Sequence, residues 1–526
     1  MKKVALSIVV TLLLASLTAS HAATSTDARI VIASEAGAHL DSDVNKGGGT
    51  DDTALIQAIL DRAPKLGALK LVVDGAILVK GLKVHSNTTI ECLNRDCGFF
   101  LADHSDQHII RNANQRPAGR EDRNISFIGG TYNGNALKQN RRHPTLGWIS
   151  AFSLHGVEQL LFRDVSITDM RTFAVHLTNW RRVVFENIYI NLGQIPENSN
   201  QDGIHVQGPG EFLSMRNIQG RTWDDMIALN ADDINSDWDL NRKFVRNDSF
   251  GSYASYGPIT DVDIDGVQAE DCAQVIRLLS RVSRIDRVSI RNVKGTYRDF
   301  GVWIGPWWRE GGDIGRLEFE NMDLRPVAPR AFNYIPTFLF WIAGKAEEIT
   351  LKNIISHVPI DDRPLVWIQP DAKVDLLRVQ GLTVFDPRTA IGDGPLIRAD
   401  GRVGLLQVRD VIVQRPSIRT PAGSLIATSM NRSALKTRLE TNPSPSVGRN
   451  GMRGWPEAVG YLTFEPQLRH IQIGDVVAEG LEHILDHQAG TIELLDVNEV
   501  SGSGGVKPIH QSGGAKILRR PQPNSK

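Results

Sequence analysis

Cysteine is scarce in this sequence, which has only three, Cys92, Cys97 and Cys272, among 526 residues. Three cysteines cannot form the disulfide framework of a small secreted scaffold or a four-cysteine zinc site. A chain of this length can bury a large core without such cross-links. We therefore expect Cys272 to be a small buried apolar residue. Cys92 and Cys97 could pair if the compartment is oxidising.

An excess of positive charge is also missing. The 59 Lys and Arg residues are balanced by 60 Asp and Glu residues, so the formal net charge is -1. Proteins that bind nucleic acid normally carry a basic excess, and we therefore expect no nucleic-acid partner. Apolar residues make up 41% of the chain, a share that excludes wholesale disorder and indicates a globular protein.

Long apolar runs are missing beyond the first residues. Lys2 and Lys3 precede an apolar run over residues 4–18, and small residues suited to cleavage follow at Ser20 and Ala22. This pattern predicts a secretory signal peptide over residues 1–22. No later apolar stretch is long enough to span a bilayer. We expect a secreted or periplasmic protein that has no membrane anchor, acts as a monomer and uses neither ATP nor nicotinamide.

One short pattern recurs along the chain. Two apolar residues stand two positions apart, and an Asn, Asp or Gly follows two positions later. The alternation predicts a strand with one buried face, and the third residue suits a tight bend because it tolerates left-handed backbone geometry. The eleven copies are 125–129, 160–164, 183–187, 213–217, 262–266, 288–292, 317–321, 349–353, 377–381, 406–410 and 471–475.

The spacing of these copies indicates a solenoid. Most begin about 22 to 33 residues apart. A leucine-rich repeat would need a fixed leucine frame, and a propeller would need about 40 residues per blade. A parallel β-helix fits best, because each coil stacks its strand on the previous one and buries a ladder of apolar side chains. We therefore predict one all-β domain, a single-stranded parallel β-helix (a solenoid), over residues 23–526.

Two regions depart from the repeat. Residues 47–61 predict an N-terminal capping helix that Thr50 or Asp51 begins and whose apolar residues share one face. Such a helix can cover the open end of a solenoid. The glycines before it do not form a phosphate-binding loop, because no Gly-Lys-Ser or Gly-Lys-Thr follows. Residues 415–467 include Pro443-Ser444-Pro445 and predict a long loop excursion from the coils.

Three aspartates stand at the spacing of one coil. Asp202 lies in one predicted coil, and Asp224 and Asp225 follow about one coil later. Two carboxylates at about 4 Å repel by roughly 4 kcal/mol at an effective dielectric of 20. This repulsion raises one pKa, which leaves a protonated acid beside an ionised base, the equipment for cleaving a glycosidic bond. A solvated acidic edge or a calcium site is the alternative.

Four segments within residues 47–300 carry a family resemblance. Residues 200–205 (Asn-Gln-Asp-Gly-Ile-His) resemble an Asn-Thr-Asp-Gly box, and residues 223–228 (Trp-Asp-Asp-Met-Ile-Ala) resemble a Gly-Asp-Asp-Cys-Ile-Ala box. Residues 275–279 stand where that family has Arg-Ile-Lys, and 173–177 resemble the strand before its first box. The family is glycoside hydrolase family 28, the polygalacturonase family, within the pectin-lyase-like parallel β-helix superfamily. The glycine-rich start near residue 47 resembles that superfamily generally and supports the fold only.

This resemblance implies a right-handed β-helix and an inverting glycosidase. Asp224 would be the general acid, and Asp202 and Asp225 would hold and activate the attacking water. Arg277 would contact the substrate near the cleaved bond. The family's Gly-His-Gly box has no counterpart here, since residues 246–257 contain no His, and Leu279 replaces a substrate-binding Lys. We therefore expect polygalacturonate to be a poor substrate.

Further positions admit two interpretations each. We expect His205 to support the site rather than to react, and we place it with Arg277 among the substrate-binding residues. Trp303 belongs to an aromatic patch with Trp307 and Trp308. Its ring either stacks on a sugar, the role we assign to it, or belongs to the core. Asp232 and its neighbour at position 233 are expected in a loop or a cap rather than in catalysis.

These observations together predict a secreted glycoside hydrolase that cleaves a polysaccharide or oligosaccharide by an inverting acid/base mechanism. We expect neither a metal nor another cofactor. One alternative is a lyase for a uronate-containing glycan, in which the aspartates hold calcium and Arg277 removes the proton. The other alternative is a non-catalytic carbohydrate-binding β-helix. Many functions share this fold, so the fold alone does not separate the three.

Overall fold

The computed structural model describes residues 28–116, 119–193, 200–232, 244–247, 251–306, 311–327, 338–357, 364–386, 394–417, 420–428, 465–502 and 506–520. For residues 244–247 and 251–254 it describes the backbone alone. The chain divides into two compact units, each described by itself below. The first holds Met1–Asp224, Asn235–Gly257 and Asp261–Ile264. The second holds Asp225–Ile234, Pro258–Thr260 and Asp265–Lys526.

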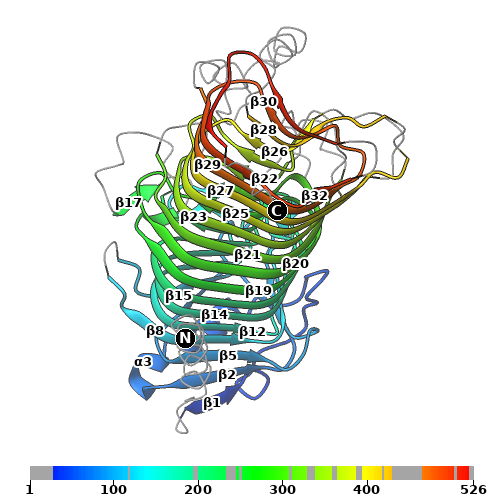
Figure 1. The fold of residues 1–526 in the computed structure, drawn as a ribbon. Coiled ribbons are helices and arrows are strands. Elements are labelled where there is room, and N and C mark those ends of the chain that lie inside the picture. The colour runs from blue at the N-terminus through cyan, green and yellow to red at the C-terminus, as the bar shows by residue number, and fades with distance from the viewer. Residues whose placement is uncertain are drawn as a thin grey trace. The chain divides into compact units, whose positions relative to one another are not determined.

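The first unit is a stack of parallel strands, drawn in blue to green in Figure 1. Its elements are β1 (Arg29–Ile32), α2 (Thr53–Leu60), α3 (Ala63–Leu66), β2 (Leu69–Val73), β3 (Ala76–Val79), β4 (Leu82–Val84), β5 (Thr88–Cys92), β6 (Gly98–Leu101), β7 (Ile110–Asn112), β8 (Asp122–Ile128), β9 (Thr131–Asn133), η1 (Ala136–Lys138), β10 (Arg142–His143), β11 (Gly147–Trp148), β12 (Phe152–Arg163), β13 (Ser166–Thr168), β14 (Val175–Asn191), β15 (Ile204–Arg221), β17 (Phe244–Asn247) and β18 (Gly251–Ser255). Strands of successive coils pair in parallel from β1 through β2, β5, β8, β12 and β14 to β15. Two antiparallel hairpins, β10 with β11 and β17 with β18, accompany the stack.

The second unit repeats the same construction, from green to red in Figure 1. Its strands are β16 (Asp225–Asn230), most of β19 (Ile259–Leu279), β20 (Ile285–Ile304), β21 (Ile314–Pro326), β22 (Phe338–Ile342), β23 (Lys345–Ser356), β24 (Val366–Ile368), β25 (Lys373–Phe385), β26 (Pro395–Ala399), β27 (Arg402–Gln414), β28 (Ser424–Thr428), β29 (Gln467–Ala478), β30 (His483–His487), β31 (Thr491–Val497), β32 (Val500–Ser501), β33 (Lys507–Gln511) and β34 (Lys516–Arg519). One column of parallel pairs runs from β20 through β21, β23, β25, β27 and β29 to β31. A second column runs from β20 through β22, β24, β26, β28 and β30 to β33. The predicted fold class, an all-β parallel β-helix, is confirmed.

The predicted apolar positions stack in register inside each unit. In the first unit Phe127, Phe162 and Phe185 are consecutive register partners, and their ring centroids lie 4.9 Å and 4.8 Å apart. In the second unit Phe319 pairs with Leu351, which pairs with Val379. All six side chains are buried. A ladder of this kind forms because each strand buries every second residue toward the interior of the coil.

The third residue of the repeat adopts the predicted left-handed bend at every copy. The positive φ angles are Gly129 68°, Asp164 60°, Asn187 55°, Asn217 54°, Gly266 83°, Asn292 59°, Asn321 56°, Asn353 51°, Gly381 76°, Asp410 55° and Asp475 56°. Side chains at these bends also bond to one another across coils. In the second unit Asn321 Nδ2 donates to Asn292 Oδ1 and Asn353 Nδ2 donates to Asn321 Oδ1, both at 3.1 Å. Hydrogen bonds between asparagine side chains therefore link the bends of successive coils.

The N-terminal helix forms within the predicted range, but it begins later than predicted. α2 starts at Thr53 with Asp52 as its N-cap, and the Asp52 side chain makes no capping bond. Asp51 instead accepts a hydrogen bond from the Thr53 amide at 3.0 Å. The prediction that Thr50 or Asp51 is the cap is therefore wrong. Its buried residues Ile56, Ile59 and Leu60 pack against β2 and β4, as a capping helix requires.

The cysteine prediction holds in part. Cys272 is buried, as expected, but Cys92 and Cys97 are free cysteines and form no disulfide. Burial raises the pKa of the Cys92 thiol to about 12, so this thiol stays protonated and unreactive. The three cysteines therefore behave as small apolar residues of the core.

Several predictions concern segments that lie wholly or partly outside the described residues. The signal peptide over 1–22 lies outside them. The loop excursion over 415–467 is interrupted by β28, a regular strand that pairs with β26 and β30, and residues 429–464 lie outside the description. The single domain over 23–526 stays a prediction. None of the described helices has the length and apolar composition needed to cross a membrane.

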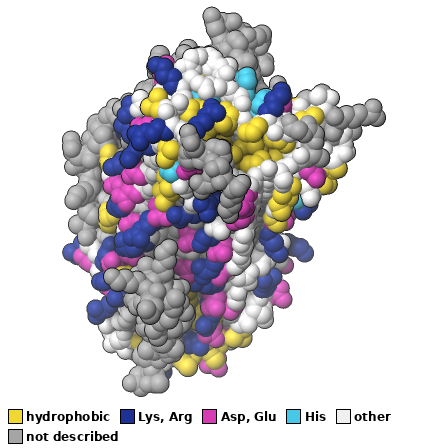
Figure 2. All heavy atoms as spheres, in the orientation of Figure 1, with side chains coloured by type: hydrophobic (Ala, Val, Ile, Leu, Met, Phe, Trp, Pro, Cys, Tyr) yellow, Lys and Arg dark blue, Asp and Glu magenta, His cyan; other side chains and the backbone are white. Residues whose placement is uncertain are grey.

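Charged side chains of both signs are interspersed on the face seen in Figure 2. Many pair across neighbouring coils. In the first unit Glu158 accepts from Arg182 at 2.8 Å and lies 3.8 Å from Arg181. In the second unit Arg378 lies 3.2 Å from Glu348. Exposed pairs of this kind each contribute little to stability.

Candidate active site

Asp202 and His205 lie at the start of β15, where the chain is tied to β14. The amide of Ala174 donates to the Asp202 carbonyl and that of Val175 to the Gly203 carbonyl, each at 2.9 Å. His205 Nδ1 lies 2.6 Å from Asp202 Oδ2, and the two side chains are 3% and 5% exposed. The His205 ring also stacks on Phe173 with centroids 4.5 Å apart. The imidazole therefore holds the Asp202 carboxylate in one orientation.

Asp224 approaches Asp202 from the bend that follows β15. The amides of Trp223 and Asp224 both donate to the Gln201 carbonyl at 3.2 Å, and Thr222 Oγ1 donates to the Asp224 carbonyl at 2.8 Å. One carboxylate oxygen of Asp224 lies within 4.8 Å of one of Asp202. The predicted neighbourhood of these two aspartates, and the bend before Asp225 that it requires, are both present.

His176 is the register partner of His205 on β14, with ring centroids 5.6 Å apart. Burial, and then the charge of His205, hold the pKa of His176 well below its usual value. His176 is therefore neutral at neutral pH and adds no charge beside Asp202.

Arg141 and Trp148 approach the site from a region that the sequence analysis did not single out. Arg141 Nη2 donates to Asn200 Oδ1 at 2.9 Å, and its guanidinium lies 5.0 Å from the centre of the Trp148 ring. Burial and Arg171 lower the pKa of Arg141, while the charge of Asp224 raises it. Arg141 is thus a cation within electrostatic reach of Asp224. The hairpin β10–β11 that carries it has no repeat pattern and no family motif, so no signal in the sequence pointed to it.

Arg277 and Trp303 belong to the second unit and are deeply buried. Arg277 is 1% exposed, Nη1 donates to the Gly305 carbonyl at 2.9 Å, and its guanidinium lies 4.2 Å above the Trp303 ring. Trp303 is 0% exposed and belongs to a core cluster with Trp341 and Trp367. Burial favours the core interpretation of Trp303, and the substrate roles of both residues stay predictions.

The other positions named in the sequence analysis differ in their surroundings. Asp225 is buried and begins β16 in the second unit. Asp232 accepts hydrogen bonds from the amides of Arg281, Val282 and Ser283, which fits the predicted cap of a loop. Leu279, at the position of the family's Lys, is buried. Asp233, Trp307 and Trp308 lie outside the described residues.

No protein-family model matches the sequence, and a search of curated proteins finds no relative. Among solved structures, a family 28 exopolygalacturonase from Yersinia enterocolitica is similar, with 14% identity, a TM-score of 0.53 and coverage of 76% of this chain and 77% of that one. The tailspike protein of E. coli bacteriophage HK620, solved as a mutant with a pentasaccharide, has 10% identity, a TM-score of 0.52 and coverage of 89% and 75%. An exopolygalacturonase from Thermotoga maritima has 11% identity, a TM-score of 0.38 and coverage of 76% and 87%. The structures similar to this chain thus include a family 28 enzyme, the Yersinia protein, as the sequence boxes predicted. The likeness to that enzyme and to the tailspike establishes the parallel β-helix fold.

Proposed function

We propose that this protein is a glycoside hydrolase that cleaves a polysaccharide or oligosaccharide. The observation that carries the proposal is the approach of Asp202 and Asp224 to within 4.8 Å. A pair of carboxyl groups flanking the bond is the usual equipment of glycosidases. The fold is shared with two solved proteins, an exopolygalacturonase and a tailspike protein in complex with a pentasaccharide, which supports a carbohydrate ligand.

Each aspartate has a separate role in the proposal. Asp224 is the more exposed of the two, and as general acid it gives its proton to the leaving oxygen. Asp202, whose Oδ2 lies 2.6 Å from His205 Nδ1, is the general base and takes a proton from the attacking water. Like charges this close favour one proton shared between the two carboxyls, which supplies the acid and the base together. The sequence prediction that Asp225 also holds the water stays part of the proposal.

Inversion is the proposed stereochemical outcome. Inverting enzymes usually hold their carboxyl groups about 6.5–9.5 Å apart and retaining enzymes about 5–5.5 Å apart. The nearest oxygens of Asp202 and Asp224 lie closer than the inverting range. The anomeric configuration of the first product, read by NMR, therefore tests the role of Asp202. Inversion supports it as the base, and retention would make it a nucleophile.

The deciding experiment digests a panel of glycans with the wild-type protein, with Asp224→Asn and with Asp202→Asn. General acid or base catalysis contributes about 10²–10⁴-fold, so each variant should lose that factor in turnover on the cleaved glycan. Asp96→Asn, an exposed aspartate of the first unit, is the matched control and should retain full turnover. Near-normal turnover by a folded Asp224→Asn protein would refute the mechanism.

A calcium-dependent lyase is the second candidate. Each calcium–oxygen bond is about 2.3–2.6 Å long, so two oxygens within 4.8 Å can share one ion. A lyase acting on a uronate leaves an unsaturated product that absorbs in the near ultraviolet. Loss of activity on chelation, restoration by calcium and that absorbance together would favour the lyase. Reducing ends released without absorbance and in the presence of a chelator favour the hydrolase.

We also propose export, from the pattern of residues 1–22. The N-terminal residue of the protein recovered from culture medium or periplasm, determined by mass spectrometry, tests this directly. We expect the mature chain to begin at Ala23, after removal of the first 22 residues. A chain that keeps its first residues and stays in the cytoplasm would refute export without touching the proposed chemistry.

A further inference from the structure

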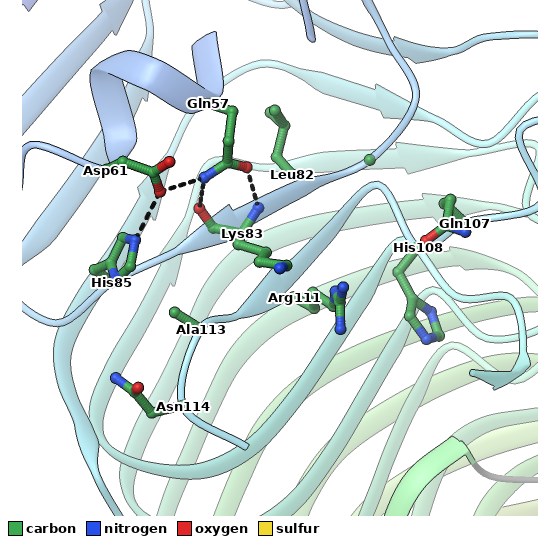
Figure 3. Close-up of a pocket in the computed structure, with 11 residues that line it drawn as sticks. Gln57, Asp61, Leu82, Lys83, His85, Gln107, His108, Arg111, Ala113 and Asn114 are labelled. Carbon is green, nitrogen blue, oxygen red and sulfur yellow. Dashed lines mark hydrogen bonds and ion pairs between the residues drawn. The ribbon is translucent and has the colours of Figure 1, made fainter. Parts of the chain in front are cut away.

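A cavity of about 460 Å³ lies in the first unit between α2 and the strands β4 and β7. Its wall includes Lys83 and Arg111, which are register partners on neighbouring coils. Figure 3 shows the two side chains on adjacent strands, with Asp61 and His85 to one side and His108 to the other. The volume falls in the range of small-ligand sites, about 300–1,000 Å³.

Both cations stand on the outward face of their strands. Leu82 and Val84, the neighbours of Lys83, are buried, whereas Lys83 is exposed. Within the part of the chain that the structure describes, neither Lys83 nor Arg111 has a carboxylate within ion-pair distance. Asp61, the acid at the rim, is bonded instead to His85 at 2.9 Å and to Gln57 at 2.8 Å.

Arg111 is half-buried, and burial alone lowers the pKa of its guanidinium. A guanidinium withdrawn from water is normally compensated by an anion. Two like charges at one coil spacing also repel each other. An arrangement that leaves both unpaired beside a cavity is what an anion-binding site requires.

Neutral polar residues line the cavity as well. His108 is buried, and its Nδ1 accepts a hydrogen bond from the Ser150 amide at 3.1 Å. Burial lowers the pKa of His108 to about 4, so the neutral ring carries its proton on Nε2, which has no hydrogen-bond partner among the described residues. The Gln107 side chain also lines the cavity. Because His108 Nε2 is buried, Gln107 is the neutral side chain of the two that can bind the polar body of a ligand.

We infer that this cavity binds a small polar ligand through an oxyanion substituent, a carboxylate, sulfate or phosphate, held between Arg111 and Lys83. The planar guanidinium can bind two oxygens at once, and the ammonium adds a point charge. The site stands apart from Asp202 and Asp224. Arg111 precedes His205 by three register steps, through Ser153 and His176, or about 14 Å at roughly 4.8 Å per coil. Binding here does not depend on glycosidic cleavage.

Calorimetry on the full chain tests the inference with ligands that share one body. Galacturonate, galactose 6-sulfate and galactose 6-phosphate are compared with neutral galactose and with inorganic sulfate and phosphate. We expect at least one charged sugar to bind at least tenfold more tightly than galactose and than either inorganic ion. The gain should shrink as salt is added.

Variants locate the binding site. Arg111→Gln should weaken binding of the charged sugar at least tenfold, Lys83→Gln should weaken it less, and Arg111→Lys should fall between wild type and Arg111→Gln. Lys138→Gln removes an exposed charge of the same unit and should change nothing. Equal binding of charged and neutral sugars, equal binding of an inorganic ion, or tight binding that survives Arg111→Gln in a protein with a wild-type circular dichroism spectrum would each overturn the inference. Glycan cleavage without such binding leaves the proposed function intact, and binding without cleavage leaves this inference intact.

Discussion

Asn321 tests how the bends hold the coils together. It has φ of 56°, donates to Asn292 and accepts from Asn353. Replacement by Ala removes both hydrogen bonds and leaves a residue that disfavours left-handed backbone. The backbone conflict costs about 1–2 kcal/mol. Two exposed hydrogen bonds add about 0.5–1 kcal/mol each. We therefore expect Asn321→Ala to lower the free energy of unfolding by about 2–4 kcal/mol.

Two further variants at this position separate the backbone contribution to that loss from the hydrogen-bond contribution. Asn321→Gly accepts the positive φ but loses both hydrogen bonds and loosens the unfolded chain, so it should cost about 1.5–3 kcal/mol. Asn321→Asp tolerates the bend and keeps the acceptor for Asn353, and it should cost only about 0.5–1 kcal/mol. Urea unfolding followed by circular dichroism measures all three. Lys373→Ala, an exposed strand residue of the same unit, is the control and should stay within about 0.5 kcal/mol of wild type.

The relative losses of unfolding free energy in the three variants show whether the left-handed backbone or the side-chain hydrogen bonds stabilise the bend. If Asn321→Ala falls within the range of the Lys373→Ala control, the bend contributes no measurable stability and its geometry is a consequence of the strands rather than a cause. If Asn321→Asp lowers the free energy of unfolding as much as Asn321→Ala does, the loss comes from side-chain hydrogen bonding and not from the left-handed backbone.

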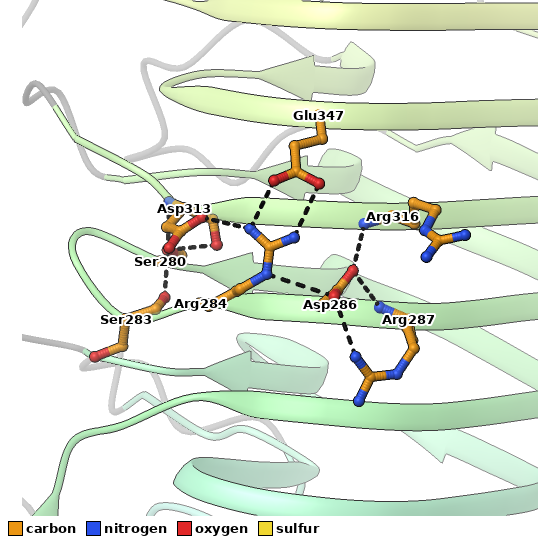
Figure 4. Close-up of polar contacts among 8 residues, drawn as sticks. All are labelled: Ser280, Ser283, Arg284, Asp286, Arg287, Asp313, Arg316 and Glu347. Carbon is orange, nitrogen blue, oxygen red and sulfur yellow. Dashed lines mark hydrogen bonds and ion pairs between the residues drawn. The ribbon is translucent and has the colours of Figure 1, made fainter.

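Three more predictions concern charge. Arg284 binds Asp313 and Glu347 at 2.9 Å (Figure 4), and the bond to Glu347 lowers the pKa of that carboxyl. Arg284→Ala should therefore lower the free energy of unfolding by about 1 kcal/mol above the ordinary Glu pKa of 4.5. The share that comes from Glu347 should disappear once the pH falls below its folded pKa, while the share from Asp286, whose pKa Arg284 also lowers, should persist to lower pH, as paired melting curves would reveal. Asp232→Ala should lower the free energy of unfolding by about 1–3 kcal/mol because three backbone amides lose their acceptor, and a silent substitution would contradict the capping role. Polygalacturonate should be cleaved more slowly than the best glycan of the panel, because Leu279 supplies no cation, and efficient release of its reducing ends would show that another cation compensates.

The coils could be predicted from the sequence because their cause is local. Each copy of the repeat specifies its own buried face and its own bend, so Phe162 and Asp164 define a strand end without reference to the rest of the chain. The N-cap of α2 was harder, since Thr50, Asp51 and Asp52 all have side chains that can cap a helix. In the structure the N-cap is Asp52, and Ile56 and Ile59 of the helix are buried.

The candidate site was predictable only where it lies on the repeat. Asp202 and Asp224 stand one coil apart, so the spacing alone brings them together. Arg141 reaches the same place from a hairpin outside the repeat, and its bond to Asn200 spans 59 residues. Such contacts depend on how a loop folds back, and neither period nor motif encodes that. A missing family residue, such as the Lys replaced by Leu279, therefore does not show that its function is missing.

One register column of the first unit shows how a uniform backbone gives different chemistry along its length. Lys83, Arg111, Ser153, His176 and His205 occupy equivalent outward positions on successive coils. Lys83 is exposed and Arg111 half-buried, whereas His176 and His205 are buried, and β18 packs against β14 and β15 at that end. Charge persists where water or a ligand can compensate it, and neutral or hydrogen-bonded groups replace it where the hairpin covers the strands. The exposed end of this column, with Lys83 and Arg111, therefore lines the proposed oxyanion cavity. The buried end, with His205, lies beside the proposed catalytic pair Asp202 and Asp224.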